Sequence, residues 1–211
     1  MIIMKKSKSP EARKKEIMDV AETLFITKGY AKTTINNILS EIDIAKGTFY
    51  YYFKSKEDVM DAIIDRFITI EVEAAEAIAA DDTLKAPDKI FRIIMGENHH
   101  GNKKEKMIEE LHEVSNEKMH QKSLIETIKQ LAPILTRMIE QGIVEGVFET
   151  PYPRETVEVL LVSSGFIFDD GIFQWDEEEK IQKAKAFVYI LETVLKADKG
   201  DFQYLLQELG K

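Results

Sequence analysis

The chain has 211 residues, enough for one large domain or two small ones. Hydrophobic residues make up 44% and charged residues 32%, an ordinary balance for a soluble protein, and the absence of cysteine excludes disulfides, thiolate metal sites and cysteine nucleophiles. The first ten residues are charged too early for a signal peptide, and no apolar run approaches the ~20 residues of a membrane helix. We therefore expect a soluble, cytoplasmic protein that does not bind a membrane.

Charge is distributed unevenly along the chain. The whole sequence carries a formal net charge of −9. Residues 1–60 contain eleven Lys and Arg against eight Asp and Glu, a net charge of +3, whereas the remaining residues carry −12. A basic segment on an acidic chain indicates that a polyanion is bound at the N-terminal end only.

Apolar residues recur at helical spacing through almost the whole chain, and no alternating strand pattern or internal repeat is present. The spacing predicts helices over residues 10–28, 35–42, from about 45, from 55 toward 80, 123–145, 154–170 and 177–196, with a short amphipathic end piece. Gly29 is placed to end the first helix, and Thr33 or Thr34 to cap the second. Ser55 and Asp58 have the spacing of a capping box. The fold class is therefore all-α.

Three short helices followed by a long one, with a tight turn between the second and the third, predict a helix-turn-helix. In the third helix Ile44, Phe49 and Phe53 are spaced to face inward. The side chains left outside are Lys46, Thr48, Tyr50 and Tyr51, with Tyr52 at the boundary. A core seldom contains three successive phenols, because each hydroxyl would need its own partner. Lysine donates to guanine or phosphate and tyrosine hydroxyls reach phosphate oxygens, so this helix has what a DNA groove requires.

The segment TTINNILSEIDIAKGTFYYYFKSKEDVM, residues 33–60, resembles the DNA-binding signature of the TetR family of bacterial transcriptional regulators. The matching positions are Thr34, Ile38, Gly47, Tyr50, Phe53, Lys56 and Glu57. The resemblance implies a helix-turn-helix DNA-binding head over residues 1–54. It also implies a larger helical-bundle domain over residues 55–211 for ligand binding and dimerisation.

Carried over by position, the resemblance assigns roles to nine residues. Lys46, Gly47 and Thr48 would enter the major groove, and Tyr50 and Tyr51 would contact base edges or phosphates. Thr34, Tyr52 and Lys56 would hold the DNA backbone, and Asn36 is a further candidate for reading bases.

The chain departs from the family at several positions. Leu39 and Ile42 stand where alanine is usual. These larger side chains require different packing where the second helix crosses its neighbouring helices. Asp43 replaces the usual turn glycine and must adopt left-handed geometry. Ala45 replaces a capping serine, and alanine caps poorly. Either Asp43 caps the recognition helix from its own position, or the first turn of that helix is less stable and orders only on DNA.

The lysine-rich segment KKSKSPEARKK, residues 5–15, has two interpretations. It is a solvated tail, or it adds sequence-independent phosphate contacts that weaken steeply with salt.

The helices expected over residues 154–170 and 177–196 are apolar on more than one face. Two such helices from each of two chains would form a four-helix interface with two-fold symmetry, unless both are buried inside a monomer. The expected interface residues are Val157, Leu161, Gly165, Phe168, Phe187, Leu191 and Val194.

A two-fold dimer would carry two recognition helices about 34–36 Å apart, which suits a pseudo-palindromic operator. A small-molecule inducer that shifts the long helix would spoil this spacing, which predicts a ligand-responsive repressor. Candidate ligand contacts are Phe67, Met95, Met107, Leu111, Leu135 and Met138, although such an apolar stripe is also what a core requires.

Alternative functions depend on the histidines. His112, Asn116 and His120 share a helix face, so a metal-responsive regulator is the first alternative and a helical metal-dependent enzyme the second. The sequence has no HExxH, phosphate-binding glycine loop or GxSxG motif, so we expect neither an enzyme nor a resident cofactor or metal. A helical adaptor that binds only protein is the third alternative.

Overall fold

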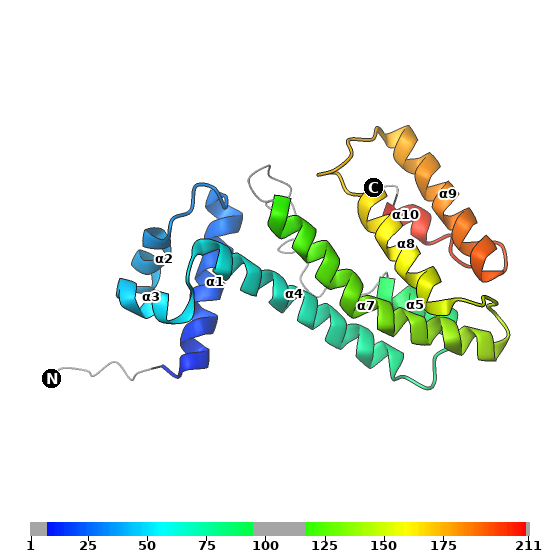
Figure 1. Cartoon of the computed structure of the whole chain (residues 1–211), viewed down its shortest axis with the longest axis horizontal. Coiled ribbons are helices and arrows are strands. Elements are labelled where there is room, and N and C mark those ends of the chain that lie inside the picture. Colours follow the sequence, from blue (N-terminus) through cyan, green and yellow to red (C-terminus); the bar gives the residue numbers. More distant parts are fainter. Residues whose placement is uncertain (1–7, 95–116, 210–211) are drawn as a thin grey trace. The chain divides into compact units, whose positions relative to one another are not determined.

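A computed structural model of the chain describes residues 8–94 and 117–209, and all regular secondary structure in these ranges is helical, as expected. The helices are α1 (Pro10–Lys28), α2 (Ile35–Ile42), α3 (Lys46–Tyr52), α4 (Lys56–Ala79), α5 (Ala86–Ile94), α7 (Glu117–Glu145), α8 (Pro153–Ile167), α9 (Glu177–Leu195) and α10 (Leu205–Leu209), labelled in Figure 1. Helix α7 begins before the predicted residue 123, and α8 ends before the predicted residue 170.

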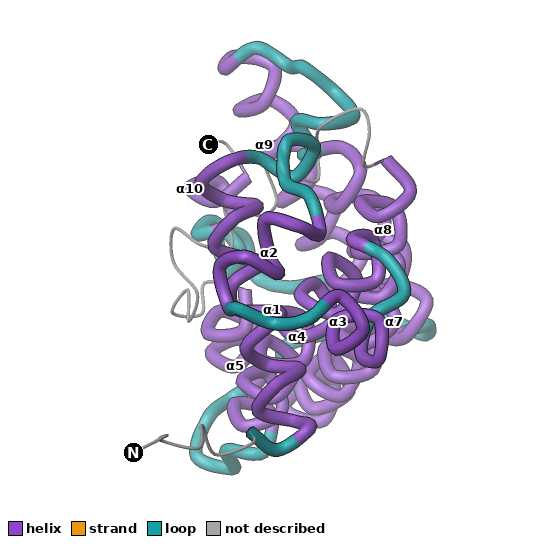
Figure 2. Tube along the Cα trace, turned by 90° about the vertical axis from the view of Figure 1, so that its left-hand side faces the viewer, coloured by secondary structure: helices purple, strands orange, loops and turns teal. Residues whose placement is uncertain are grey.

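The contacts between residues divide the chain into two compact units, and the division falls between Phe67 and Ile68, inside α4. We refer to residues 8–67 as the head and to residues 68–94 and 121–209 as the body. Figures 1 and 2 both show α1, α2 and α3 gathered in the head. The body contains α5, α8, α9, α10 and most of α7.

Local signals determine where the helices of the head begin and end. Gly29 ends α1 with φ of 90°. Thr34 rather than Thr33 caps α2, because its Oγ1 accepts a hydrogen bond from the backbone N–H of Asn37 at 3.2 Å. The Asn37 side chain accepts from the backbone N–H of Thr34 at 3.0 Å, which completes a capping box. At α4, Ser55 Oγ accepts from the N–H of Asp58 at 3.1 Å.

The body has a hydrophobic core to which each of its helices contributes. Its buried members include Ile90 of α5, Met138 of α7, Val157 of α8 and Leu191 of α9. The rings of Phe148 and Phe202 are stacked with centroids 5.9 Å apart. Within the part of the chain that the structure describes, no helix has an apolar stretch long enough to cross a bilayer.

Gly142 in α7 is required by the packing of this core. A Cβ atom built on Gly142 would lie 2.1 Å from Cδ2 of Phe148, whose ring is only 4% exposed. Because that ring is held against Phe202, it has little room to move away.

We therefore predict that Gly142→Ala lowers the free energy of unfolding by about 1–3 kcal/mol through overpacking. Urea unfolding followed by circular dichroism measures the change. Val144→Ala, two residues away and 89% exposed, is the matched control and should stay within about 0.5 kcal/mol of the parent protein. Equal midpoints for Gly142→Ala and the parent would contradict the packing described for this site.

Candidate nucleic-acid interface

Helix α3 has one buried face and one exposed face. Phe49 is fully buried and Phe53, the residue that ends the helix, is 2% exposed. Tyr50 and Tyr51 are 45% and 77% exposed, and Tyr52 is half-buried. The expected exposure of the first two phenols and the boundary position of the third are confirmed.

The exposed face of α3 places a cation beside aromatic rings. Lys46 is exposed, and its Nζ lies 5.8 Å from the centroid of the Tyr50 ring. Tyr51 and Tyr52 contact each other edge to face, with centroids 4.9 Å apart. Thr48 is half-buried. A cation and phenols on one solvent-facing helix can donate hydrogen bonds to phosphate oxygens and pack on sugars.

The turn before α3 has the geometry that the sequence predicts. Asp43 adopts left-handed geometry with φ of 52° and ψ of 58°. The backbone N–H of Ile44 donates to the carbonyl of Leu39 at 3.2 Å. Ala45 begins α3 without a side-chain cap, as expected. Gly47 follows in open space, since a Cβ atom there would meet no heavy atom within 4 Å. The packing of the head therefore does not explain the glycine.

Two of the residues expected to hold the DNA backbone have partners inside the head. Thr34 Oγ1 donates to Asn37 Oδ1 at 3.0 Å, so its single donor is in use. Lys56 Nζ donates to the carbonyl of Tyr30 at 2.7 Å and lies 4.0 Å from the centroid of that ring. Burial lowers the pKa of the Lys56 ammonium, and the nearby Glu57 carboxylate opposes this shift. Asn36 is exposed. Thr34 and Lys56 thus stabilise the head through internal hydrogen bonds. Only the rest of their hydrogen-bonding capacity is available to DNA.

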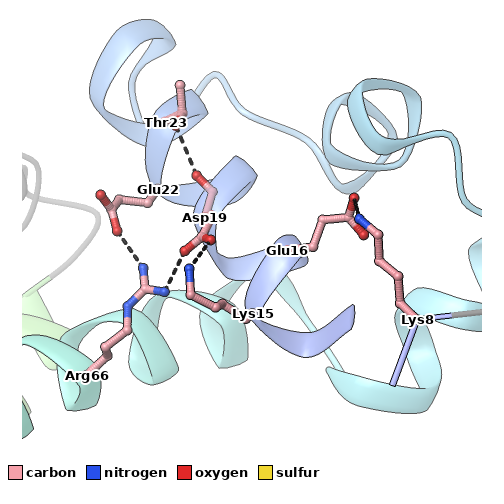
Figure 3. A network of polar contacts seen from close by, with 7 residues as sticks. All are labelled: Lys8, Lys15, Glu16, Asp19, Glu22, Thr23 and Arg66. Atoms are coloured by element: carbon pink, nitrogen blue, oxygen red, sulfur yellow. Dashed lines mark hydrogen bonds and ion pairs between the residues drawn. The ribbon is translucent and has the colours of Figure 1, made fainter. Parts of the chain in front are cut away.

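A network of charges joins α1 to α4 inside the head (Figure 3). Arg66 of α4 donates to Asp19 Oδ1 at 2.7 Å and to Glu22 Oε2 at 2.5 Å. Lys15 donates to the other oxygen of Asp19 at 2.5 Å. Burial alone would raise the pKa of Asp19, but the hydrogen bonds from Lys15 and Arg66 outweigh it and the pKa lies below its usual value. Sequence reasoning missed Arg66, because its partners are 44 and 47 residues away.

The residues predicted to contact a ligand have different positions. Phe67, Leu135 and Met138 are all buried, and the last two belong to the body core. Met95, Met107, Leu111, His112 and Asn116 lie outside the described residues, as does the side chain of His120. Among the residues that are described, no group of three or more His, Cys, Asp and Glu is arranged to hold a metal ion.

The residues predicted at a dimer interface are only partly on the surface. Val157 and Leu191 are 5% and 8% exposed and belong to the body core. Gly165 lies against α7, where an added Cβ would be 3.8 Å from Leu124. Leu161, Phe168 and Phe187 are half-buried, and Val194 is 44% exposed.

A different set of large apolar side chains is exposed on these two helices. We refer to it as the α8–α9 surface, and it consists of Val159, Val162, Phe166, Ile167, Ile181, Tyr189, Ile190 and Val194. Val159, Val162 and Phe166 follow one another at i, i+3 and i+7, so helical spacing could have revealed this stripe too. The sequence does not indicate which of the two stripes on α8 meets the core.

Two family models match the chain in agreement with this architecture. "Bacterial regulatory proteins, tetR family" matches residues 17–63, and "Tetracyclin repressor-like, C-terminal domain" matches residues 99–190. The chain belongs to the TetR family of bacterial transcriptional regulators. Members of this family are DNA-binding transcription factors rather than enzymes.

Individual relatives match the chain over different lengths. A helix-turn-helix transcriptional regulator from the lacX 3′ region of Lactococcus lactis subsp. lactis is 46% identical over 57 residues, which is 27% of this chain and 29% of that protein. The match therefore spans under a third of that relative's length. YfiR of Bacillus subtilis is 23% identical over 89% of this chain and 94% of its own. The solved structure of Salmonella enterica GusR has a TM-score of 0.62 at 17% identity, covering 90% of this chain and 98% of that one.

The charge network predicts how the stability of the head depends on pH. Arg66→Ala leaves the nearly buried Glu22 without this partner and should lower the free energy of unfolding at pH 7 by about 3 kcal/mol. Since the pKa of Asp19 is lowered in the folded state, its contribution is present above its unfolded pKa of about 3.9 and is lost as the pH falls through the folded value. The difference between parent and Arg66→Ala should therefore shrink between pH 5 and pH 3.

Urea unfolding at several pH values measures this difference. Lys15→Ala is the control, because Lys15 is 70% exposed and its pair with Asp19 should contribute under about 1 kcal/mol. A difference between parent and Arg66→Ala that stays constant down to pH 3 would show that the Asp19 pair does not act as described.

Proposed function

We propose that this protein is a transcriptional repressor that binds a pseudo-palindromic operator as a homodimer and is released from it by a small-molecule effector. The observation that carries the proposal is the exposed face of α3, where Lys46, Tyr50 and Tyr51 stand outward on a helix-turn-helix. We propose repression rather than activation because residues 99–190 match a tetracycline-repressor-like domain. We assign DNA binding to residues 1–54, effector binding and dimerisation to residues 55–211, and the site of action to the bacterial cytoplasm, where the DNA lies.

In this proposal α3 enters the major groove. Lys46 and Thr48 contact base edges, and Tyr50, Tyr51 and Tyr52 contact bases or phosphates. Gly47 allows the backbone to approach the DNA closely, which agrees with the open space around it. Asn36 is exposed on α2 and serves as a second reading position. Thr34 and Lys56 contact the DNA backbone with the hydrogen-bonding capacity that their internal partners leave.

We predict that Lys46→Ala weakens operator binding by about 1–3 kcal/mol, since it removes a donor to a base or phosphate. Tyr50→Phe should also weaken binding, because only the hydroxyl is lost. Mobility shift on a duplex that the parent protein selects from a random pool measures both effects. Tyr152→Phe, 65% exposed at the start of α8, is the matched control and should bind like the parent. Unchanged binding in both head variants would reject α3 as the reading helix.

Gly47→Ala separates approach to DNA from folding. The new methyl group enters open space, and alanine favours a helix by up to about 1 kcal/mol over glycine, so the variant should be at least as stable as the parent. If the backbone of α3 lies close to DNA, its operator affinity should nevertheless fall. Parent-like affinity would remove Gly47 from the interface.

Dimerisation through α8 and α9 is supported by the apolar residues that these helices expose. The α8–α9 surface gathers eight large hydrophobic side chains, among them Tyr189 at 70% and Val159 at 63% exposure. Exposed apolar side chains in this number typically mark a protein–protein contact. A two-fold arrangement buries the same surface on both chains and closes the assembly as a dimer. Its two heads can then occupy successive half-sites about 34–36 Å apart.

Val162→Glu and Ile190→Glu should each convert the dimer to a monomer, because each would bury an unpaired carboxylate of both chains in an apolar interface. Sedimentation velocity measures the change. Val144→Glu, at an 89% exposed position on α7, is the control with the same chemical substitution and should remain dimeric. A monomeric parent protein, or dimeric α8 and α9 variants, would contradict this interface.

Release by an effector is supported by the continuity of α4. This helix begins four residues after α3 ends and continues past the point where the two units divide. A ligand that prefers one position of α4 in the body can therefore bias the head, and a 5–150-fold change in operator affinity requires about 1–3 kcal/mol of coupling. Candidate contacts are Phe67, Leu135 and Met138, together with Met95, Met107 and Leu111.

A thermal-shift screen of apolar small molecules tests this coupling. We predict that compounds which raise the melting temperature of the free protein also weaken its binding to the selected duplex. Leu135→Ala and Met138→Ala should reduce both effects in parallel. Bound compounds that leave DNA affinity unchanged would contradict effector release.

A further inference from the structure

The cations of the head fall into two groups, according to whether an acidic side chain neutralises them. Four of them pair with carboxylates of α1. These pairs are Lys8 and Arg13 with Glu16, Lys15 with Asp19, and Arg66 with Asp19 and Glu22. The paired carboxylates largely neutralise these four positive charges. The four side chains therefore contribute little to the electrostatic field that an approaching polyanion meets.

Lys14 differs from the neighbours on either side of it. It is exposed and has no acidic partner among the described residues, whereas Arg13 and Lys15 each have one. Its Nζ instead lies 5.7 Å from the centroid of the Phe53 ring. Phe53 is the residue that ends α3, so a cation from α1 stands beside the C-terminal end of the reading helix.

Helix α3 therefore has an unneutralised ammonium group near each end. Lys46 opens the helix and lies over the ring of Tyr50, and Lys14 lies over the ring that follows its last turn. A helix of seven residues is about 10 Å long, and the major groove of B-DNA is about 12 Å wide. A cation near each end of a helix of this length can therefore reach phosphates of the groove walls when the helix enters the groove.

We propose that Lys14 is a DNA-binding residue that contacts a backbone phosphate from α1, beside the end of α3. The inference rests on the proposed function, since it presumes that α3 enters the groove. It also divides the lysine-rich segment by role. Arg13 and Lys15 form ion pairs within α1, whereas Lys14 binds the nucleic acid. Lys14 also lies near the C-terminal end of α3, where a positive charge stabilises the helix dipole. The experiment must separate that effect from a phosphate contact.

The experiment compares Lys14→Ala, Lys14→Arg and Lys15→Ala with the parent protein. Each binds a duplex that the parent selected from a random pool and a second duplex of the same length and random sequence, over a series of salt concentrations. If Lys14 contacts a phosphate, Lys14→Ala should reduce the slope of log affinity against log salt by about 0.9 for each head bound. The loss of affinity should be similar on both duplexes, because a phosphate carries no sequence information. Lys14→Arg should retain the parent slope.

Lys15→Ala is the matched control, one residue along the same helix. Because Lys15 is paired with Asp19, its removal should change the slope by less than half as much. Equal slopes for Lys14→Ala and the parent would overturn the proposal, and so would equal effects of Lys14→Ala and Lys15→Ala. A loss of thermal stability in Lys14→Ala with an unchanged slope would assign the residue to the helix dipole and overturn the proposal as well. If the parent protein itself selects no sequence and binds neither duplex, the proposed function fails, which is a separate outcome.

Discussion

The burial of Phe49 and Phe53 is the constraint on which the rest of the head depends. Both rings are buried in the head, at 0% and 2% exposure. Phe49 belongs to the same short helix as the phenols, and Phe53 is the residue that follows it. On a helix of 3.6 residues per turn, fixing Phe49 inward turns Tyr50 and Tyr51 toward solvent. The chemistry offered to DNA is thus a consequence of core packing.

The remaining contacts of the head hold this arrangement in place. Lys56 joins the start of α4 to Tyr30, and Arg66 joins its middle to the acids of α1. These contacts join α1 to α4 through charged groups that are partly shielded from water, which strengthens their interaction. In contrast, Ala45, which precedes α3, gives that helix no side-chain cap. A helix without a side-chain cap lacks one of the interactions that stabilise a helix start.

Local signals made much of the fold predictable. Gly29, Thr34 and Asp43 mark helix ends by chemistry that acts within a few residues, and the structure places those ends accordingly. The end of α8 was missed, because the Asp169 carboxylate accepts from the N–H of Gly171 at 2.8 Å and forms a turn where apolar spacing suggested more helix. The stripe of α8 that faces solvent could not be predicted, since both stripes are apolar and only packing against the body core distinguishes Val157 from Val162. The ion pairs of Arg66 could not be predicted either, because its partners are distant in sequence.

The central claim is that the phenol face of α3 lies against DNA, and photocrosslinking tests it most directly. p-Benzoylphenylalanine in place of Tyr51 keeps an aromatic side chain at a position that is 77% exposed. The same probe in place of Tyr152, which is 65% exposed on the body, is the control. The account predicts that irradiation joins the probe at position 51 to the selected duplex, and that the probe at position 152 gives no crosslink. Protein that protects the duplex from cleavage but crosslinks only from position 152, or from neither position, would contradict it.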